Sequence, residues 1–187
     1  PAAAGGVIRE LAYKALGQDD AASARRYFAW LAERGYLSAS DVKQYYFLLE
    51  ENGELEAALA LSEQAQTSCL EQVQLLMKMN NTSGAREKLL NCSVQENAVV
   101  WLSLAERLEL YDAVQRTNFT NKTLQQQRRQ LLMNHYHQQQ AWQRQIELLG
   151  GVASSEAELT YLAMAYERLG DVRNAEETWL QIWRDYQ

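Results

Sequence analysis

The stretch Glu156–Tyr186, EAELTYLAMAYERLGDVRNAEETWLQIWRDY, decides the fold. On either side of Leu169-Gly170-Asp171, apolar residues recur at the spacing of one helix face. The first stripe contains Leu159, Leu162, Ala163 and Tyr166, and the second contains Ala175, Trp179 and Ile182. A glycine followed by an aspartate is a common end of one helix and start of the next, so the stretch predicts two antiparallel helices joined by a tight turn.

The order of small and large residues resembles the tetratricopeptide (TPR) repeat, a helical hairpin that occurs in tandem copies. The residues that carry the resemblance are two small residues, two aromatic residues and the turn glycine: Ala163, Ala175, Tyr166, Trp179 and Gly170. The small residues let the two helices approach closely, and the aromatic residues fill the space beside them. One hairpin cannot bury both of its faces, so the resemblance implies further copies.

Small residues that open a second helix mark such copies along the chain. They are Ala24, Ala58, Ala85, Ala113, Ala141 and Ala175, at intervals of 34, 27, 28, 28 and 34 residues. Thirty-four is the TPR period, and the shorter intervals imply hairpins trimmed by about one or two turns. The fifth copy fits worst, because Gln125, Arg128 and Arg129 fall at expected core positions. The sequence predicts an all-α solenoid of about six antiparallel hairpins, forming a single domain over residues 1–187.

The composition favours helices and argues against several functional classes. One proline and nine glycines among 187 residues leave the chain free to form helices. A net charge of −6 argues against a nucleic-acid partner, which needs a clustered basic face. No run of eighteen apolar residues is present, so we expect no segment that spans a membrane. Uncovered apolar residues on the last helix predict a segment of a longer repeat protein, with self-association through uncapped ends.

The two cysteines are placed symmetrically about a turn. Cys69 lies near the start of the third hairpin and Cys92 at its end, with the turn Asn80–Gly84 almost midway. Residues equidistant from the turn of an antiparallel hairpin are level with each other, so a disulfide is feasible. It would close a loop of about 24 residues, contribute about 3–4 kcal/mol and imply an oxidising compartment. The alternative is two free cysteines that serve as small core residues.

Residues capable of catalysis do not form a recognisable constellation. His135 and His137 are two positions apart on a helix and point to different faces, which disfavours a shared metal. The sequence contains no phosphate loop, dinucleotide fingerprint or nucleophile elbow. We therefore expect no enzyme activity, no cofactor and no metal.

In TPR arrays the first helix of each repeat lines a concave binding face. Transferring these positions gives a mixed polar and aromatic set: Arg9, Tyr13, Lys43, Phe47, Gln74, Gln126, Gln130 and Met164. Some family members clamp a C-terminal carboxylate with Lys and Asn, and of that clamp only Lys43 is present here. A receptor of that kind is therefore disfavoured. The aromatic and amide side chains suit an extended peptide or a polysaccharide, and equally an ordinary solvated surface.

Irregular repeats, a candidate disulfide, acidic charge and many Trp and Gln residues together resemble one group within the family. These are the periplasmic TPR scaffolds of Gram-negative outer-membrane proteins for exopolysaccharide export, and a related outer-membrane phage receptor. The resemblance implies a non-catalytic scaffold in the periplasm that binds other proteins of an envelope complex, with polysaccharide as a further partner. Two alternatives stay open: a cytosolic regulatory module, which free cysteines would favour, and a carbohydrate-binding solenoid.

Overall fold

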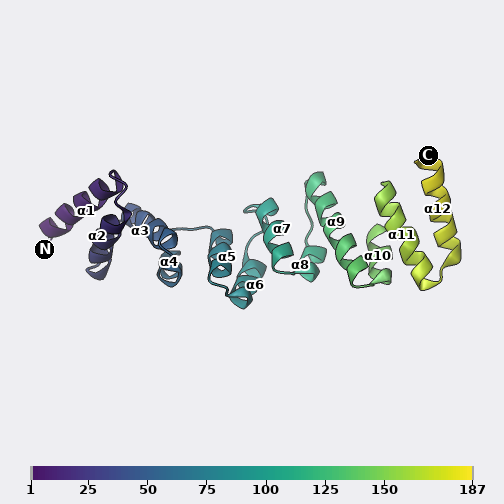
Figure 1. The fold of residues 1–187 in the computed structure, drawn as a ribbon, viewed down its shortest axis with the longest axis horizontal. Coiled ribbons are helices and arrows are strands. Elements are labelled where there is room, and N and C mark those ends of the chain that lie inside the picture. Colours follow the sequence, from purple (N-terminus) through teal and green to yellow (C-terminus); the bar gives the residue numbers. More distant parts are fainter. Residues whose placement is uncertain (1, 187) are drawn as a thin grey trace. The chain divides into compact units, whose positions relative to one another are not determined.

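The computed structural model describes residues 2–186, and its regular secondary structure over that range consists of α-helices alone (Figure 1). The chain divides into two compact units, Pro1–Ser93 and Val94–Gln187. The first unit contains α1 (Ala2–Leu16), α2 (Ala21–Glu33), α3 (Ala39–Glu51), α4 (Leu55–Leu61), α5 (Cys69–Lys78) and α6 (Thr82–Asn91). The second contains α7 (Ala98–Arg107), α8 (Tyr111–Arg116), α9 (Lys122–Gln138), α10 (Trp142–Leu149), α11 (Glu156–Leu169) and α12 (Val172–Asp185). The all-helical class expected from the sequence is confirmed.

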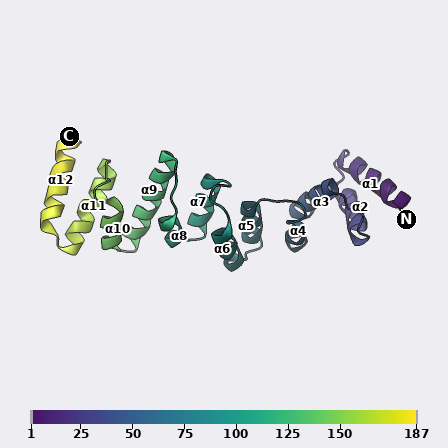
Figure 2. The ribbon, with the colours of Figure 1, turned by 180° about the vertical axis from the view of Figure 1, so that it is seen from behind.

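Within each unit, every helix packs against the next one along the chain. The helices pair into hairpins, three in each unit, and we call the members of a pair its first and second helix. In the second unit the first helices α7 and α9, and α9 and α11, also touch each other. The last pair, α11 and α12, lies side by side in both views (Figures 1 and 2).

All six hairpins turn in the same way. The residue before the N-cap of each second helix has a positive φ of 54–78°, and we call it the turn residue: Asp19, Gly53, Asn80, Glu109, Gln140 and Gly170. The amide of the next residue donates a hydrogen bond of 2.8–2.9 Å to the carbonyl five positions earlier, as from Asp171 to Tyr166. Only two of the six turn residues are glycines, so in four hairpins a side chain tolerates the left-handed conformation that glycine adopts most easily.

The turn residue gives the six hairpins a common numbering. The small-residue position of the second helix lies five residues after it and is at most 3% exposed: Ala24, Ala58, Ala85, Val114, Gln145 and Ala175. The expected markers Ala113 and Ala141 are wrong, because Ala113 precedes the buried Val114 and Ala141 is the N-cap of α10. The intervals become 34, 27, 29, 31 and 30 residues. Alanine does not mark the small-residue position in the fourth and fifth hairpins, because Val114 and Gln145 occupy it there.

Capping residues explain where most helices begin. Ser38 and Ser68 form capping boxes with Asp41 and Glu71, which satisfies backbone amides at the starts of α3 and α5. Three second helices, α4, α8 and α10, begin without a side-chain cap and have 7, 6 and 8 residues. Short second helices therefore account for part of the shortening of the repeats.

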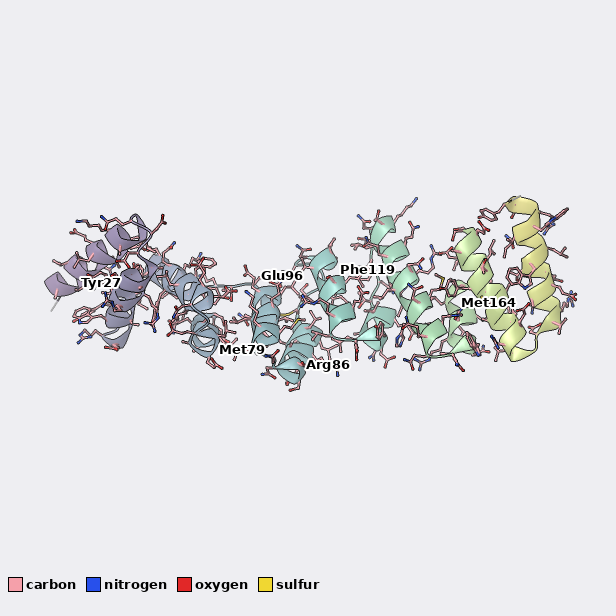
Figure 3. The ribbon with its side chains drawn as sticks, viewed as in Figure 1. Tyr27, Met79, Arg86, Glu96, Phe119 and Met164 are labelled. Carbon is pink, nitrogen blue, oxygen red and sulfur yellow. A yellow bond between two sulfur atoms is a disulfide. The ribbon has the colours of Figure 1, made fainter. Side chains whose placement is uncertain are left out.

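The apolar cores lie within hairpins and between successive ones. In the first unit Phe28 of α2 is fully buried, with its ring 5.6 Å from that of Tyr13 and 6.3 Å from that of Tyr45. In the second unit Phe119, which follows α8, is buried and lies 6.4 Å from the ring of Trp101 (Figure 3). Phe119 thus adds to the core beyond the end of the shortest second helix.

A disulfide closes the open end of the α5/α6 hairpin. The structure brings Cys69, the first residue of α5, and Cys92, the C-cap of α6, to a Cα separation of 5.6 Å and joins their sulfur atoms. The cysteines are the pair expected from their symmetry about the turn.

Candidate interaction surface

Two positions of each first helix, ten and six residues before the turn residue, define what we call the first-helix face. In the first unit they are Arg9, Tyr13, Lys43, Phe47, Leu70 and Gln74. In the second unit they are Val99, Ser103, Gln130, Asn134, Thr160 and Met164. All are exposed or half-buried except Leu70. Of the eight residues expected to bind, seven lie on this face, and Gln126 lies one helical turn before Gln130 on α9.

Arg9 and Tyr13 are tied to a buried carboxylate. Asp41 is fully buried and accepts hydrogen bonds from Arg9 Nε at 2.8 Å and from the Tyr13 hydroxyl at 3.1 Å. Arg9 also donates to the Tyr36 carbonyl at 2.6 Å. Both side chains therefore fasten α1 to the start of α3, and this structural role was not visible in the sequence.

The surroundings of Asp41 favour its charged form. Burial alone would raise the pKa of Asp41, but hydrogen bonds from the Ser38 backbone amide and the Arg9 guanidinium outweigh it and hold that pKa below its ordinary value. The carboxylate therefore stays ionised at neutral pH. An ionised, fully hydrogen-bonded carboxylate fixes the arrangement of the two first helices around it.

The second unit repeats this arrangement. Glu158 precedes its turn residue by twelve positions, as Asp41 does, and forms an ion pair with Arg129 at 2.9 Å. Arg129 also donates to the Val152 carbonyl at 3.1 Å, and the Ser154 amide donates to Glu158 at 2.9 Å. In both cases an arginine on one first helix binds a buried acid on the next first helix and a carbonyl in the loop that directly precedes that helix. We call the two sites the arginine clasps.

The remaining expected residues of the first unit are freely presented. Lys43 and Gln74 are exposed, and the Phe47 ring is 53% exposed, with its centroid 5.5 Å from that of Tyr46. A large apolar ring beside polar, flexible side chains is a typical anchor for a partner molecule. Phe47 is therefore the strongest single candidate for a contact residue in this unit.

In the second unit the first-helix face is hollowed between α7 and α9. A depression of about 380 Å³ is lined mainly by amide and other polar side chains: Glu106, Thr123, Gln126, Gln127, Gln130, Leu131 and Asn134. Two of the expected residues thus lie in the same depression. Asn134 and Ser103 are not among the expected residues, because the alanine markers Ala113 and Ala141 place the fourth and fifth hairpins in the wrong register.

Met164, which is labelled in Figure 3, borders a separate depression. It lies on α11, and the other lining residues come from α9, the turn after it, α10 and α11: His137, Gln138, Gln140, Trp142 and Arg168. The thioether is half-buried, so the side chain serves packing as well as exposure. Met164 is not brought together with Gln126 and Gln130 in one depression.

A third depression in the second unit lies beside the turns that follow α7 and α9. The rings of Tyr111 and His135 are stacked there with centroids 3.6 Å apart, and Arg144 approaches Asp112 at 3.6 Å. Burial lowers the pKa of His135, so its imidazole is neutral at pH 7. The depression therefore presents charged groups of both signs, the carboxylate of Asp112 and the guanidinium of Arg144.

The α9/α10 hairpin contains buried polar atoms without a hydrogen-bond partner among residues 2–186. They are Arg129 Nε, which forms only the ion pair with Glu158, the Tyr136 hydroxyl, His137 Nδ1 and Gln145 Oε1. Gln145 is fully buried at the small-residue position, and its amide nitrogen donates to the Tyr161 carbonyl at 2.7 Å. A buried carbonyl without a donor is costly, so this hairpin is less well satisfied than its neighbours.

Two other features are absent from residues 2–186. No group of three or more His, Cys, Asp or Glu side chains is arranged to hold a metal ion. No helix in this range is both long enough and apolar enough to cross a membrane.

No known protein-family model matches the chain, and no curated protein matches it as a relative. The hairpins and the chemistry of their exposed faces are therefore the features of this chain that bear on its function.

Proposed function

We propose that the chain is a non-catalytic scaffold, a TPR-like solenoid that binds partner proteins of an envelope complex. On this proposal it belongs to the periplasmic region of an outer-membrane protein for polysaccharide export, or of a related phage receptor. The observation that supports it most is the first-helix face. Every hairpin presents the same two positions of its first helix on this face. The side chains at these positions differ in chemistry from one hairpin to the next.

The repeated hairpin supports a binding role for a physical reason. The backbone amides and carbonyls of a helix are paired within the helix, so only side chains are available to a partner. The arginine clasps fix α1 to α3 and α9 to α11, so exposed residues such as Phe47 on α3 and Asn134 on α9 are held in place relative to a neighbouring first helix. Preorganised side chains reduce the entropy lost when a partner binds.

The disulfide supports the periplasmic placement. Disulfides persist in oxidising compartments such as the periplasm and are rare in the cytosol. The bridge between Cys69 and Cys92 therefore fits an envelope protein better than a cytosolic module. The check is the intact mass of protein from its native source, alkylated with and without prior reduction. Resistance to alkylation until reduction is the expected result, and free alkylation after unfolding would favour the cytosolic alternative.

Site-specific photocrosslinking in the native cells tests the scaffold role. A photoreactive residue is placed at Phe47, Gln74 or Asn134, with matched controls at the exposed second-helix positions Glu87 and Gln143. We expect the three first-helix positions to crosslink to a recurring protein partner, while the two controls do not. Equal labelling at all five positions, or none, would contradict a binding role for this face.

A second candidate function, carbohydrate binding, is favoured by the depression between α7 and α9. Amide side chains such as Gln126, Gln130 and Asn134 donate and accept hydrogen bonds, as sugar hydroxyls require. The test is calorimetric titration with a panel of neutral and acidic oligosaccharides. Binding that is lost in Gln130→Ala/Asn134→Ala and kept in the control Gln143→Ala supports this candidate. Absence of heat with every oligosaccharide, or equal binding by both variants, removes it.

A further inference from the structure

The fifth hairpin differs from its neighbours at a position that otherwise belongs to the core. Five residues before the turn residue, four of the other five first helices carry a buried apolar residue: Leu48, Leu75, Leu104 and Ala165. In α9 this position is His135, which is half-buried and stacks on the ring of Tyr111, the first residue of α8. A polar ring at a packing position gives up apolar contact, and such local departures from a pattern are expected at binding sites.

The stacked rings of Tyr111 and His135 line a depression of about 600 Å³, which we call the turn depression. The polar residues around them come from the turns after α7 and α9 and from α8, α9 and α10: Glu109, Asp112, Tyr136, Gln138, Gln139 and Arg144. The volume lies in the range of small-ligand sites. None of these residues belongs to the first-helix face, so the turn depression is a separate surface.

The lining of the turn depression suits a hydrophilic ligand. Among residues 2–186, Ala141 is its one aliphatic lining residue, so a protein partner finds no apolar pocket for a side chain. Asp112 and Arg144 approach each other at 3.6 Å and are both largely exposed. An exposed ion pair is weakly held, so each of its members can exchange the other for a ligand group. Gln138 and Gln139 add amides that both donate and accept.

Tyr136 contributes a buried hydroxyl to the same place. Its side chain is 2% exposed, and its hydroxyl has no hydrogen-bond partner among residues 2–186. The guanidinium carbon of Arg144 lies 5.9 Å from the centroid of its ring. Burial raises the pKa of Tyr136, so the phenol keeps its proton at neutral pH. An unpaired buried hydroxyl is costly, and a ligand oxygen that enters beside Arg144 can supply the missing partner.

We propose that the turn depression binds a saccharide that carries no acidic group. One face of a sugar ring consists of C–H groups, which pack on the exposed part of the Tyr111 and His135 rings. The hydroxyls at the edge of the sugar ring donate to Asp112 and accept from Arg144, while the two glutamine amides take either role. This site depends neither on the partner of the first-helix face nor on the depression between α7 and α9.

The charges of the turn depression exclude acidic sugars. Glu109 and Asp112 place two carboxylates against one guanidinium, that of Arg144. Burial lowers the pKa of His135, so its imidazole adds no positive charge at pH 7. An acidic sugar therefore meets a net negative charge, whereas a neutral sugar or an amino sugar is not repelled.

NMR titration of the 187-residue chain tests the proposal with defined trisaccharides. The neutral probes are trimers of glucose, galactose, mannose and N-acetylglucosamine, the basic probe is a glucosamine trimer, and the acidic probe is a galacturonic acid trimer. The reporter is the imidazole of His135, and His137, the other of the two histidines, is the internal reference because it lies outside the turn depression. The backbone amides of Gln130 and Asn134 report on the depression between α7 and α9.

We expect the His135 resonances to shift saturably with at least one neutral or basic trimer, and the acidic trimer to bind at least about tenfold more weakly. Arg144→Ala removes a charged donor and lowers the affinity about tenfold. The matched control is Arg107→Ala, an exposed arginine of the same unit outside the turn depression, which keeps the wild-type affinity. Circular dichroism verifies the helical fold of both variants.

A charge variant separates binding from a merely structural role. Asp112→Asn keeps the shape of the side chain and removes one of the two carboxylates, so the acidic trimer gains affinity relative to the wild-type protein. Three results would overturn the proposal: His135 resonances that respond to no trimer, equal affinities of Arg144→Ala and Arg107→Ala, or an acidic trimer that binds the wild-type protein most tightly. Shifts at Gln130 and Asn134 without a shift at His135 would also overturn it and would place the sugar between α7 and α9.

Discussion

The two units follow the same backbone plan and fill it differently. Each contains three hairpins with the same turn and one arginine clasp. The first unit also contains the disulfide between Cys69 and Cys92. In the second unit, by contrast, the α9/α10 hairpin buries four polar atoms without hydrogen-bond partners among the described residues. The turn shared by all six hairpins is therefore distinct from the features that set the stability of each one, such as the disulfide and the unpartnered polar atoms.

The last two hairpins show that the small residues do not determine the path of the chain. In α11/α12 the residues at the facing buried positions are Ala163 and Ala175, and in α9/α10 they are Met133 and Gln145. Both hairpins nevertheless make the same turn, with the same hydrogen bond to the carbonyl five residues back. The turn and the apolar pattern therefore fix the geometry, while the identity of the buried residues adjusts the stability.

Removing the disulfide is expected to have the largest effect. In Cys69→Ala/Cys92→Ala, the unfolded chain regains the freedom of a loop closed across 23 positions, which lowers the free energy of unfolding of the first unit by about 3 kcal/mol. Peptide-resolved hydrogen exchange measures this as faster exchange in α5 and α6. The amides of α9 and α10 serve as the internal control and keep their rates. Unchanged exchange in α5 and α6 would show that the bridge does not stabilise its hairpin.

Leucine at the small-residue position distinguishes the two final hairpins. Ala175→Leu forces extra volume between α11 and α12, where the alanine is 3% exposed, and costs about 1–3 kcal/mol. Gln145→Leu has nearly the same volume and removes the unpartnered Oε1, so its effect stays within about 1 kcal/mol despite the loss of the bond to Tyr161. Urea unfolding of both variants makes the comparison. Equal losses of stability in the two variants would contradict this difference between the two hairpins.

Exchanging turn residues gives a smaller pair of effects with opposite signs. Gly170 has φ +78°, and a Cβ there meets no atom within 4 Å, so Gly170→Ala costs about 1 kcal/mol through backbone strain alone. Gln140→Gly relieves the same strain in α9/α10 and gains less than about 1 kcal/mol, because glycine also loses more backbone entropy on folding. Thermal unfolding reports both. A loss of stability in Gln140→Gly would contradict the shared turn.

Acid is expected to weaken the first unit through its clasp. The pKa of Asp41 lies below its ordinary value of 3.8, so the native state holds the charged form more strongly than the unfolded state does. The stabilisation is complete well above pH 4 and is lost as the pH falls through the native pKa. Asp41→Asn should remove this part of the acid dependence of unfolding. If the stability of the wild-type protein and that of the variant depend on pH in the same way below pH 4, groups other than Asp41 cause that dependence.

Sequence patterns predicted the helical class and the cysteine pair, because both depend on spacing along the chain. They placed the fourth and fifth hairpins incorrectly, since Val114 and Gln145 replace alanine and Glu109 and Gln140 replace the turn glycine. A left-handed turn is invisible in sequence when its residue is not glycine or asparagine.

The candidate surface was predicted in part. Exposed residues of regular helices, such as Lys43 and Phe47, follow from the helical period. The clasp role of Arg9 and Tyr13 depends on Asp41, which is far away in sequence, and no local pattern indicates it. Trp179, expected to fill the space between helices, is 37% exposed, and its indole nitrogen donates a hydrogen bond to Glu167 at 2.9 Å.

Hydrogen exchange of individual backbone amides, followed by NMR, tests most directly whether the six hairpins share one turn. The amide after each turn residue is bonded to a carbonyl five positions back, although it lies between two helices: Asp20, Glu54, Asn81, Leu110, Ala141 and Asp171. We predict that all six exchange far more slowly than unstructured amides do. Exchange of the Leu110 and Ala141 amides at the rates of unstructured peptides, with protection at the other four, would contradict the shared turn in the fourth and fifth hairpins.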